Sequence, residues 1–299
     1  MGRMNAGEDP SREMGAARAL EDELEFEAAA LVYTAILSKE PSHRPARRRL
    51  GKCLFSMRRW DEAVHEFRIL RHHEPDNAGD CCSLGCALAC MGCWSESAAV
   101  YRDWLETRPA NARILTDLAI VLGQLGESDA GLEMLRRALA LSPDYSYAHF
   151  TLAERYERSC LYEAAVREYR GVSAGDHRFA NAQLHLGLCL VHCHRDDEAA
   201  PVLQDVIRRS KNETAVHLTL AGCLFRLRRW NEAVDALDSA PKELCSRLPV
   251  RWFRAECIAH TGAPAQRLGG YAMSCVLSGA LSLSASRDAV LKLCARRHG

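Results

Sequence analysis

FSMRRWDEAVHEF, from Phe55 to Phe67, returns almost unchanged as FRLRRWNEAVDAL, from Phe225 to Leu237. Each stretch has an aromatic residue, then two arginines and a tryptophan, and then Glu-Ala-Val. The two stretches begin 170 residues apart, which is five times 34. This distance indicates a repeat of 34 residues whose intermediate copies have diverged.

The same register extends well beyond these two stretches. Trp60 has Phe26 one step before it and Trp94 one step after it. Three residues after this slot stands a small residue in each step: Ala29, Ala63, Ser97, Gly131, Ala165, Ala199 and Ala233. Four residues later stands a larger one: Tyr33, Phe67, Tyr101, Leu135, Tyr169, Leu203 and Leu237. A proline closes the earlier steps, at Pro41, Pro75, Pro109 and Pro143.

This pattern resembles the tetratricopeptide repeat, which reads W-x2-L-G-x2-Y, then A-x3-F, then P. The resemblance implies an all-α fold, a right-handed α-solenoid of helix pairs. It places seven repeats within residues 10–247, at 10–43, 44–77, 78–111, 112–145, 146–179, 180–213 and 214–247. We expect a flexible N-terminus at 1–9, a degenerate eighth repeat at 248–281 and a C-terminal capping helix at 282–299.

Helix packing explains why these slots recur. Small residues at the eighth and twentieth positions let two helices approach closely, and the bulky residue at the twenty-fourth fills the space that remains. Proline cannot continue a helix and ends it. One helix pair cannot bury its apolar face alone, so neighbouring pairs must stack. From the fifth repeat on, the closing proline is replaced by His177, Lys211 and Cys245. We therefore expect repeats five to seven to be more irregular than the first four.

Composition limits the kinds of function. Lysine plus arginine and aspartate plus glutamate both number 39, so net charge gives no reason to expect a nucleic-acid partner. We also expect no membrane insertion, because no stretch of about eighteen apolar residues is free of charge. Without an apolar export signal, a cytoplasmic location is expected. The sequence contains none of the phosphate-loop, nucleophile-elbow or metalloprotease motifs, so we expect neither enzymatic activity nor a cofactor.

The family resemblance also implies where a partner would bind. Tetratricopeptide geometry places a concave groove along the first helix of each repeat. We expect the chain to be a non-catalytic adaptor or scaffold, or a subunit of a multiprotein complex, that holds an extended peptide or a helix of a protein partner there. The positions that would line the groove include Arg18, Arg48, Arg49, Lys52, Phe55, Cys82, Cys86, Arg113, Asp117, Tyr147, Phe150 and Glu154.

A basic run suggests the chemistry of that partner. RPARRRLGK, at residues 44–52, supplies Arg48, Arg49 and Lys52 to groove positions. Arginine binds carboxylates through two parallel hydrogen bonds, so the run predicts an acidic partner segment. The alternative is a solvated helix end. The Lys, Asn, Asn, Lys, Arg set with which some family members bind chaperone tails is not present in three consecutive repeats, so such a partner is not expected.

The cysteines leave a second function open. Four of them occupy the tenth position of their repeats, where a small apolar residue packs: Cys53, Cys189, Cys223 and Cys257. Cys82, Cys86 and Cys90 differ, because their spacing of four places them on one side of a helix. Packing or groove lining is the simpler interpretation. A thiol-based metal-binding or redox-sensing function on this helix side is the alternative.

Overall fold

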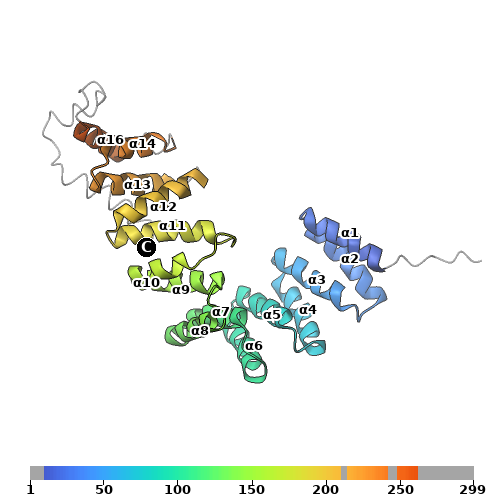
Figure 1. Cartoon of the computed structure of the whole chain (residues 1–299). Helices are drawn as coiled ribbons and strands as arrows, with labels where there is room; N and C mark the ends of the chain where they lie inside the picture. The colour runs from blue at the N-terminus through green and yellow to red at the C-terminus, as the bar shows by residue number, and fades with distance from the viewer. Residues whose placement is uncertain (1–9, 210–213, 242–247, 262–299) are drawn as a thin grey trace, which may run out of the picture. The chain divides into compact units, whose positions relative to one another are not determined.

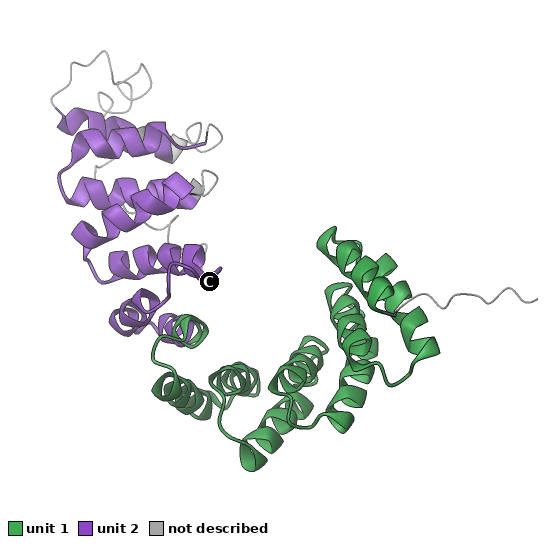
Figure 2. Cartoon of the chain, turned by 45° about the vertical axis from the view of Figure 1, so that its right-hand side comes forward, with its two compact units in different colours: residues 1–151 green, residues 152–299 purple. Residues whose placement is uncertain are grey.

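The computed structural model describes residues 10–209, 214–241 and 248–261, and this part of the chain is helical without β-strands. The expected N-terminus at 1–9, the end of the expected eighth repeat and the expected cap at 282–299 lie outside the described residues. None of the described helices is long and apolar enough to cross a membrane. The chain divides into two compact units, unit 1 at Met1–Thr151 and unit 2 at Leu152–Gly299 (Figure 2).

The helices alternate along the chain as first and second members of pairs (Figure 1). In unit 1 the first helices are α1 (Pro10–Asp22), α3 (Arg44–Ser56), α5 (Ala78–Cys90) and α7 (Ala112–Gln124). Their second helices are α2 (Phe26–Lys39), α4 (Trp60–His73), α6 (Trp94–Thr107) and α8 (Ser128–Leu141). The boundary between the units falls within α9 (Ser146–Arg158). Unit 2 continues with α10 (Tyr162–Arg170), α11 (Phe179–His192), α12 (Asp196–Arg209), α13 (Thr214–Arg226), α14 (Trp230–Asp238) and α16 (Leu248–His260).

The all-helical fold predicted from the sequence is confirmed, and the helix starts show its basis. First helices begin at Pro10, Arg44, Ala78 and Ala112, which are 34 residues apart. The division into seven repeats and a degenerate eighth stays a prediction. The expected irregularity after the fourth repeat is present in part, because α10 and α14 have 9 residues each, whereas α12 has the 14 residues of α2 and α4.

The turn inside each pair has one residue in the left-handed region. These residues also recur every 34 positions, with φ between 57° and 82°: Leu24, Arg58, Gly92, Gly126, Cys160, His194 and Arg228. Only two of them are glycine, the residue that adopts this conformation without steric cost. The turn is therefore imposed by the packing of the two helices rather than by local preference.

Close helix crossings confirm the packing role of the small residues. A Cβ atom added at Gly51 would lie 2.6 Å from the Phe67 ring, and one added at Gly85 would lie 2.2 Å from the Tyr101 ring. The second-helix residues Ala63, Ala165 and Ala233 have no exposed surface. The tenth-position cysteines are buried too, as their packing role requires: Cys53, Cys189, Cys223 and Cys257.

Candidate partner-binding surface

The first helices of unit 1 are neighbours of one another. α5 contacts both α3 and α7 directly, and Arg49 on α3 is hydrogen-bonded to Glu21 on α1. The side that these successive first helices share is here called the first-helix face. Most of the residues predicted to bind a partner belong to these helices. Whether each one is exposed there, or is used to hold the repeats together, decides what the face can bind.

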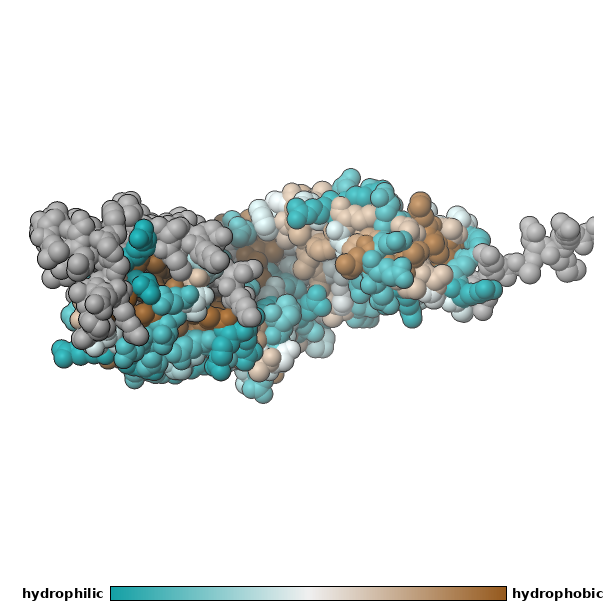
Figure 3. Space-filling model, turned by 90° about the horizontal axis from the view of Figure 1, so that it is seen from above, coloured by the Kyte–Doolittle hydropathy of each residue, from teal (hydrophilic) through white to brown (hydrophobic). Residues whose placement is uncertain are grey.

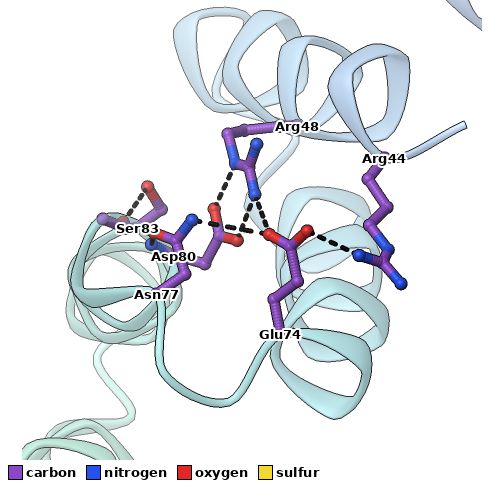
Figure 4. Close-up of polar contacts among 7 residues, drawn as sticks. Arg44, Arg48, Glu74, Asn77, Asp80 and Ser83 are labelled. Carbon is purple, nitrogen blue, oxygen red and sulfur yellow. Dashed lines mark hydrogen bonds and ion pairs between the residues drawn. The ribbon is translucent and has the colours of Figure 1, made fainter.

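Arg48 is used inside the protein (Figure 4). Its guanidinium donates two hydrogen bonds to the carboxylate of Asp80 on α5, at 2.6 and 2.7 Å, and a third to Glu74 at 2.6 Å. The Asp80 side chain is only 1% exposed. The hydrogen bonds with Asp80 raise the pKa of Arg48, and those from Arg44 and Arg48 lower the pKa of Glu74. Arg48 therefore joins two repeats, and its predicted role in binding a partner stays a prediction.

Arg49 also binds an acid of a neighbouring repeat, but only through part of its side chain. Its guanidinium donates a hydrogen bond of 2.9 Å to Glu21 on α1, and Glu21 also accepts one from the buried Tyr33 hydroxyl. Burial, followed by the bond to Glu21, raises the pKa of Tyr33. The Arg49 side chain nevertheless keeps 39% of its surface exposed. It is a structural residue with one edge on the first-helix face.

Two predicted cations and one aromatic residue remain on the face. Arg18 on α1 and Lys52 on α3 are exposed. Phe55 is partly buried and packs against the hydrophobic core of the first two helix pairs. The basic run thus contributes Lys52 in full and Arg49 in part, because Arg48 is held by acids.

The thiols and Asp117 lie deeper than predicted. Cys82 is 1% exposed and Asp117 is 5% exposed, so both side chains are buried in the folded chain, and their predicted place in a groove stays a prediction. Cys86 is half-buried, with its sulfur 3.6 Å from the Tyr101 hydroxyl, and Cys90 is exposed. The guanidinium of Arg113, which is exposed, lies 3.7 Å from the Asp117 carboxylate.

Burial also disfavours reaction of Cys82 and Cys86. It raises the pKa of Cys86 to about 11 and that of Cys82 further. Metals and oxidants react with the thiolate, so a raised pKa disfavours both uses. No cluster of three His, Cys, Asp or Glu side chains placed for a metal ion is found within residues 10–209, 214–241 and 248–261. Nothing in this arrangement supports the metal or redox alternative.

The remaining predicted residues all lie on α9, within which the boundary between the two units falls. Tyr147 and Phe150 are partly exposed and belong to unit 1, whereas Glu154, also partly exposed, belongs to unit 2. Burial raises the pKa of Glu154.

Unit 2 repeats one of these arrangements, which the sequence analysis missed. Glu157 accepts a hydrogen bond of 2.7 Å from the Tyr169 hydroxyl, and Nδ1 of His185 lies 3.1 Å from the same carboxylate. These three residues stand 136 positions after Glu21, Tyr33 and Arg49, which is four repeats. The signal was present in the sequence as an acid at the twelfth position followed by a cation at the sixth position of the next repeat.

Comparison with known proteins identifies the family. Tetratricopeptide repeat profiles match residues 14–78, 116–175 and 195–244. The chain belongs to the tetratricopeptide repeat family. This is a family of protein-interaction scaffolds, and the helix pairs and their 34-residue spacing agree with it.

Individual tetratricopeptide relatives are distant. The chain is 29% identical over 129 residues to protein FlbA of Caulobacter vibrioides, covering 43% of this chain and 22% of that protein. It is 23% identical over 195 residues to anaphase-promoting complex subunit 3 of Schizosaccharomyces pombe, covering 65% and 29%. The structure of the C-terminal part of a repeat protein from Cytophaga hutchinsonii superposes with a TM-score of 0.57 at 11% identity, over 80% of this chain and 98% of that one. The chain spans less than a third of the length of the two curated relatives.

Proposed function

We propose that this tetratricopeptide protein is a non-catalytic adaptor that binds a protein partner on the first-helix face of unit 1. The observation that carries the proposal is the separation of charges on α1 and α3: Arg48 is held by acids, whereas Arg18 and Lys52 are exposed. The internal ion pairs fix the backbone on which the exposed cations stand. Such a preformed surface loses little conformational entropy when a partner binds.

The partner segment that fits this face is acidic. Arg18 and Lys52, with the exposed edge of Arg49, offer positive charge, and the half-buried Phe55 on α3 offers an apolar contact. An extended peptide or a helix that carries carboxylates and one apolar side chain would match both features. We extend the proposal to membership of a multiprotein complex, because one relative is itself named as a complex subunit. No nucleic acid, cofactor or membrane is part of the proposal, and a cytoplasmic location remains a prediction.

Charge reversal on the first-helix face tests the proposal. Arg18→Glu with Lys52→Glu should abolish recovery of the native partner in a pull-down followed by mass spectrometry, and leave the melting temperature nearly unchanged, because both side chains are exposed. Arg136→Glu is the matched control, since Arg136 is an exposed arginine on the second helix α8. Recovery from the unchanged protein should fall as salt is raised. Equal recovery by the double variant and the control would refute binding through this face.

A further inference from the structure

The outer side of α2 presents leucine to solvent. Leu31 is 70% exposed, and Leu24, in the turn just before the helix, is 72% exposed. Figure 3 shows apolar surface beside hydrophilic residues at the N-terminal end of unit 1. Ala28 and Ala35 complete this side of the helix, and Ala35 is exposed as well. We call these four residues the α2 outer stripe.

The stacking of repeats does not require these leucines. At the register position of Leu31, the later repeats carry exposed residues that are mostly small or polar: His65, Ala99, Glu133, Arg167, Pro201 and Asp235. At the register position of Leu24 they carry Arg58, Gly92, Gly126, Cys160, His194 and Arg228. Leu24 also has a φ of 64°, which is unfavourable for a bulky side chain. Leu24 and Leu31 are the two most exposed of the large apolar side chains in the described residues, and they lie close together in the sequence, which favours a binding role over chance exposure.

The spacing of the stripe suits a partner helix. Ala28, Leu31 and Ala35 on α2 are separated by three and four residues, which is the heptad spacing of two packed helices, and Leu24 lies in the turn that precedes the helix. The alanines on either side of Leu31 leave holes into which large side chains of the facing helix can insert. An extended strand has no such match, because its side chains alternate with a period of two.

Charge defines the flanks of that partner. The sequence EDELEFE surrounds Leu24 with four exposed carboxylates, those of Asp22, Glu23, Glu25 and Glu27. Asp22 ends α1, where the helix dipole disfavours an acid, so helix stability does not explain the whole cluster. The charge of Glu27 acts on the nearby cation Arg59, but the guanidinium of Arg59 donates its two hydrogen bonds, of 2.6 and 2.7 Å, to Glu62. A second copy of the stripe would bring acids against acids and be repelled.

From these observations we propose that the α2 outer stripe docks an amphipathic helix of another protein, with leucine-sized residues at heptad spacing and lysine or arginine beside them. The stripe lies on a second helix of its pair, apart from the first-helix face. The two proposals therefore stand or fall separately.

A pair of synthetic peptides tests this chemistry. The probe is a helical peptide of about three heptads with leucine at the a and d positions and lysine at e and g; the comparison peptide carries glutamate at e and g. Fluorescence anisotropy with the full chain should show binding of the lysine peptide at least about tenfold tighter than that of the glutamate peptide. Leu24→Ser with Leu31→Ser should weaken lysine-peptide binding by at least about tenfold, because the peptide leucines could then bury less apolar surface. Glu25→Lys with Glu27→Lys should weaken it as well.

Two controls keep the outcome decisive. Leu141→Ser removes a leucine that is 52% exposed on α8 and should leave peptide binding unchanged. Sedimentation of the unchanged protein and of Leu31→Ser tests for self-association. Equal binding of the two peptides, or lysine-peptide binding that survives substitution of both leucines, would overturn the proposal. So would a concentration-dependent dimer that Leu31→Ser dissolves, because the occupant would then be a second copy.

Discussion

The contact between the first two helix pairs of unit 1 and the contact of α11 with the pair before it in unit 2 use the same three repeat positions. In unit 1 Arg49 binds Glu21, which also accepts from Tyr33. In unit 2 the cation position holds His185, whose ring stacks on Tyr169 with centroids 5.7 Å apart. Arginine is always charged, whereas histidine near neutral pH is only partly so. The position therefore requires a hydrogen-bond donor beside the carboxylate and does not require a permanent charge.

The next contact between helix pairs uses a second set of positions, and there the residues of the two units differ in chemistry. Arg48 and Asp80 join the second and third helix pairs through a buried ion pair. Four repeats later the same positions hold Leu184 and Val216, and Val216 is 2% exposed. The fold accepts either an ion pair or two apolar side chains there. In unit 1 the ion pair is thus a choice of sequence, with consequences that mutation can measure.

The largest effect should come from breaking that pair on one side. Arg48→Leu leaves the Asp80 carboxylate buried without its main partner, and we expect a loss of about 3 kcal/mol in the free energy of unfolding. Arg48→Leu with Asp80→Val transplants the residues of unit 2 and should recover all but about 1 kcal/mol. Urea unfolding followed by circular dichroism measures both. Arg68→Leu is the control, because it removes an exposed pair with Glu96 and should cost less than about 1 kcal/mol.

If the double variant were as unstable as the single one, the equivalence of the two contacts would be refuted. Charge reversal at Arg48 would destabilise the repeats themselves, so a loss of binding in that variant would say nothing about the partner.

The second-largest effect should be a difference in reactivity between buried and exposed cysteine thiols. Burial raises the pKa of Cys53 and Cys86 in unit 1 to about 11, and that of Cys223 in unit 2 to about 12. At pH 8 a thiol whose pKa is near 11 carries about a hundredfold less thiolate than an ordinary thiol. Pulsed alkylation with iodoacetamide, read by mass spectrometry, should label the exposed Cys90 and Cys160 first.

The same shifts predict a loss of stability in alkali. Thiols of the unfolded chain ionise near pH 8.5 to 9, whereas the buried thiols hold their protons to about pH 11. The stabilisation is therefore complete below about pH 8 and falls as the pH rises toward 11. Early labelling of Cys86 would contradict this and return the thiol sensor to consideration.

Substitutions at close helix crossings should have the third-largest effect, a loss in the free energy of unfolding. Gly85→Ala would place a Cβ atom 2.2 Å from the rigid ring of Tyr101, and we expect a loss of about 2 kcal/mol. Gly187→Ala in unit 2 would place it 2.5 Å from the end of the Leu203 side chain, which can turn aside, so about 1 kcal/mol is expected. Gly15→Ala is the control, since a Cβ atom there meets nothing within 4 Å. Thermal unfolding of the three variants gives the order; equal losses at Gly85 and Gly187 would show that ring rigidity does not matter.

The sequence predicted helices, register and core because those depend on patterns that each repeat carries within itself. Gly51 and Phe67 could be paired from spacing alone, since both belong to one repeat. The residues of the candidate site were harder to predict from the sequence, because the exposure of Arg48 depends on an acid in the following repeat. Family position placed Arg48, Cys82 and Asp117 on the groove, yet packing of α5 against its neighbours buries Cys82 and uses Arg48. The positions that meet between repeats recur at fixed spacing, but the residues on them change: Asp80 holds Arg48, whereas Val216 stands at the equivalent position four repeats later.

The smallest effect is expected in the two nearly identical stretches, Phe55 to Phe67 and Phe225 to Leu237. Both place an arginine in the left-handed turn, Arg58 with φ 59° and Arg228 with φ 60°. Both follow it with an arginine bound to a glutamate three residues on, Arg59 to Glu62 and Arg229 to Glu232. The structures of the two turns agree as closely as their sequences, so equal substitutions should have equal effects.

Glycine is the test residue for this turn. Arg58→Gly and Arg228→Gly remove the steric strain of a left-handed side chain but increase the entropy of the unfolded chain, so each should stabilise by about 0.5 kcal/mol. Gly92→Ala is the reverse change, at φ 78°, and should destabilise by about 1 kcal/mol. Differential scanning calorimetry of the three variants compares them at matched concentration. A gain at Arg58 with a loss at Arg228 would mean that the surroundings of the turn, which differ between the units, outweigh its backbone conformation.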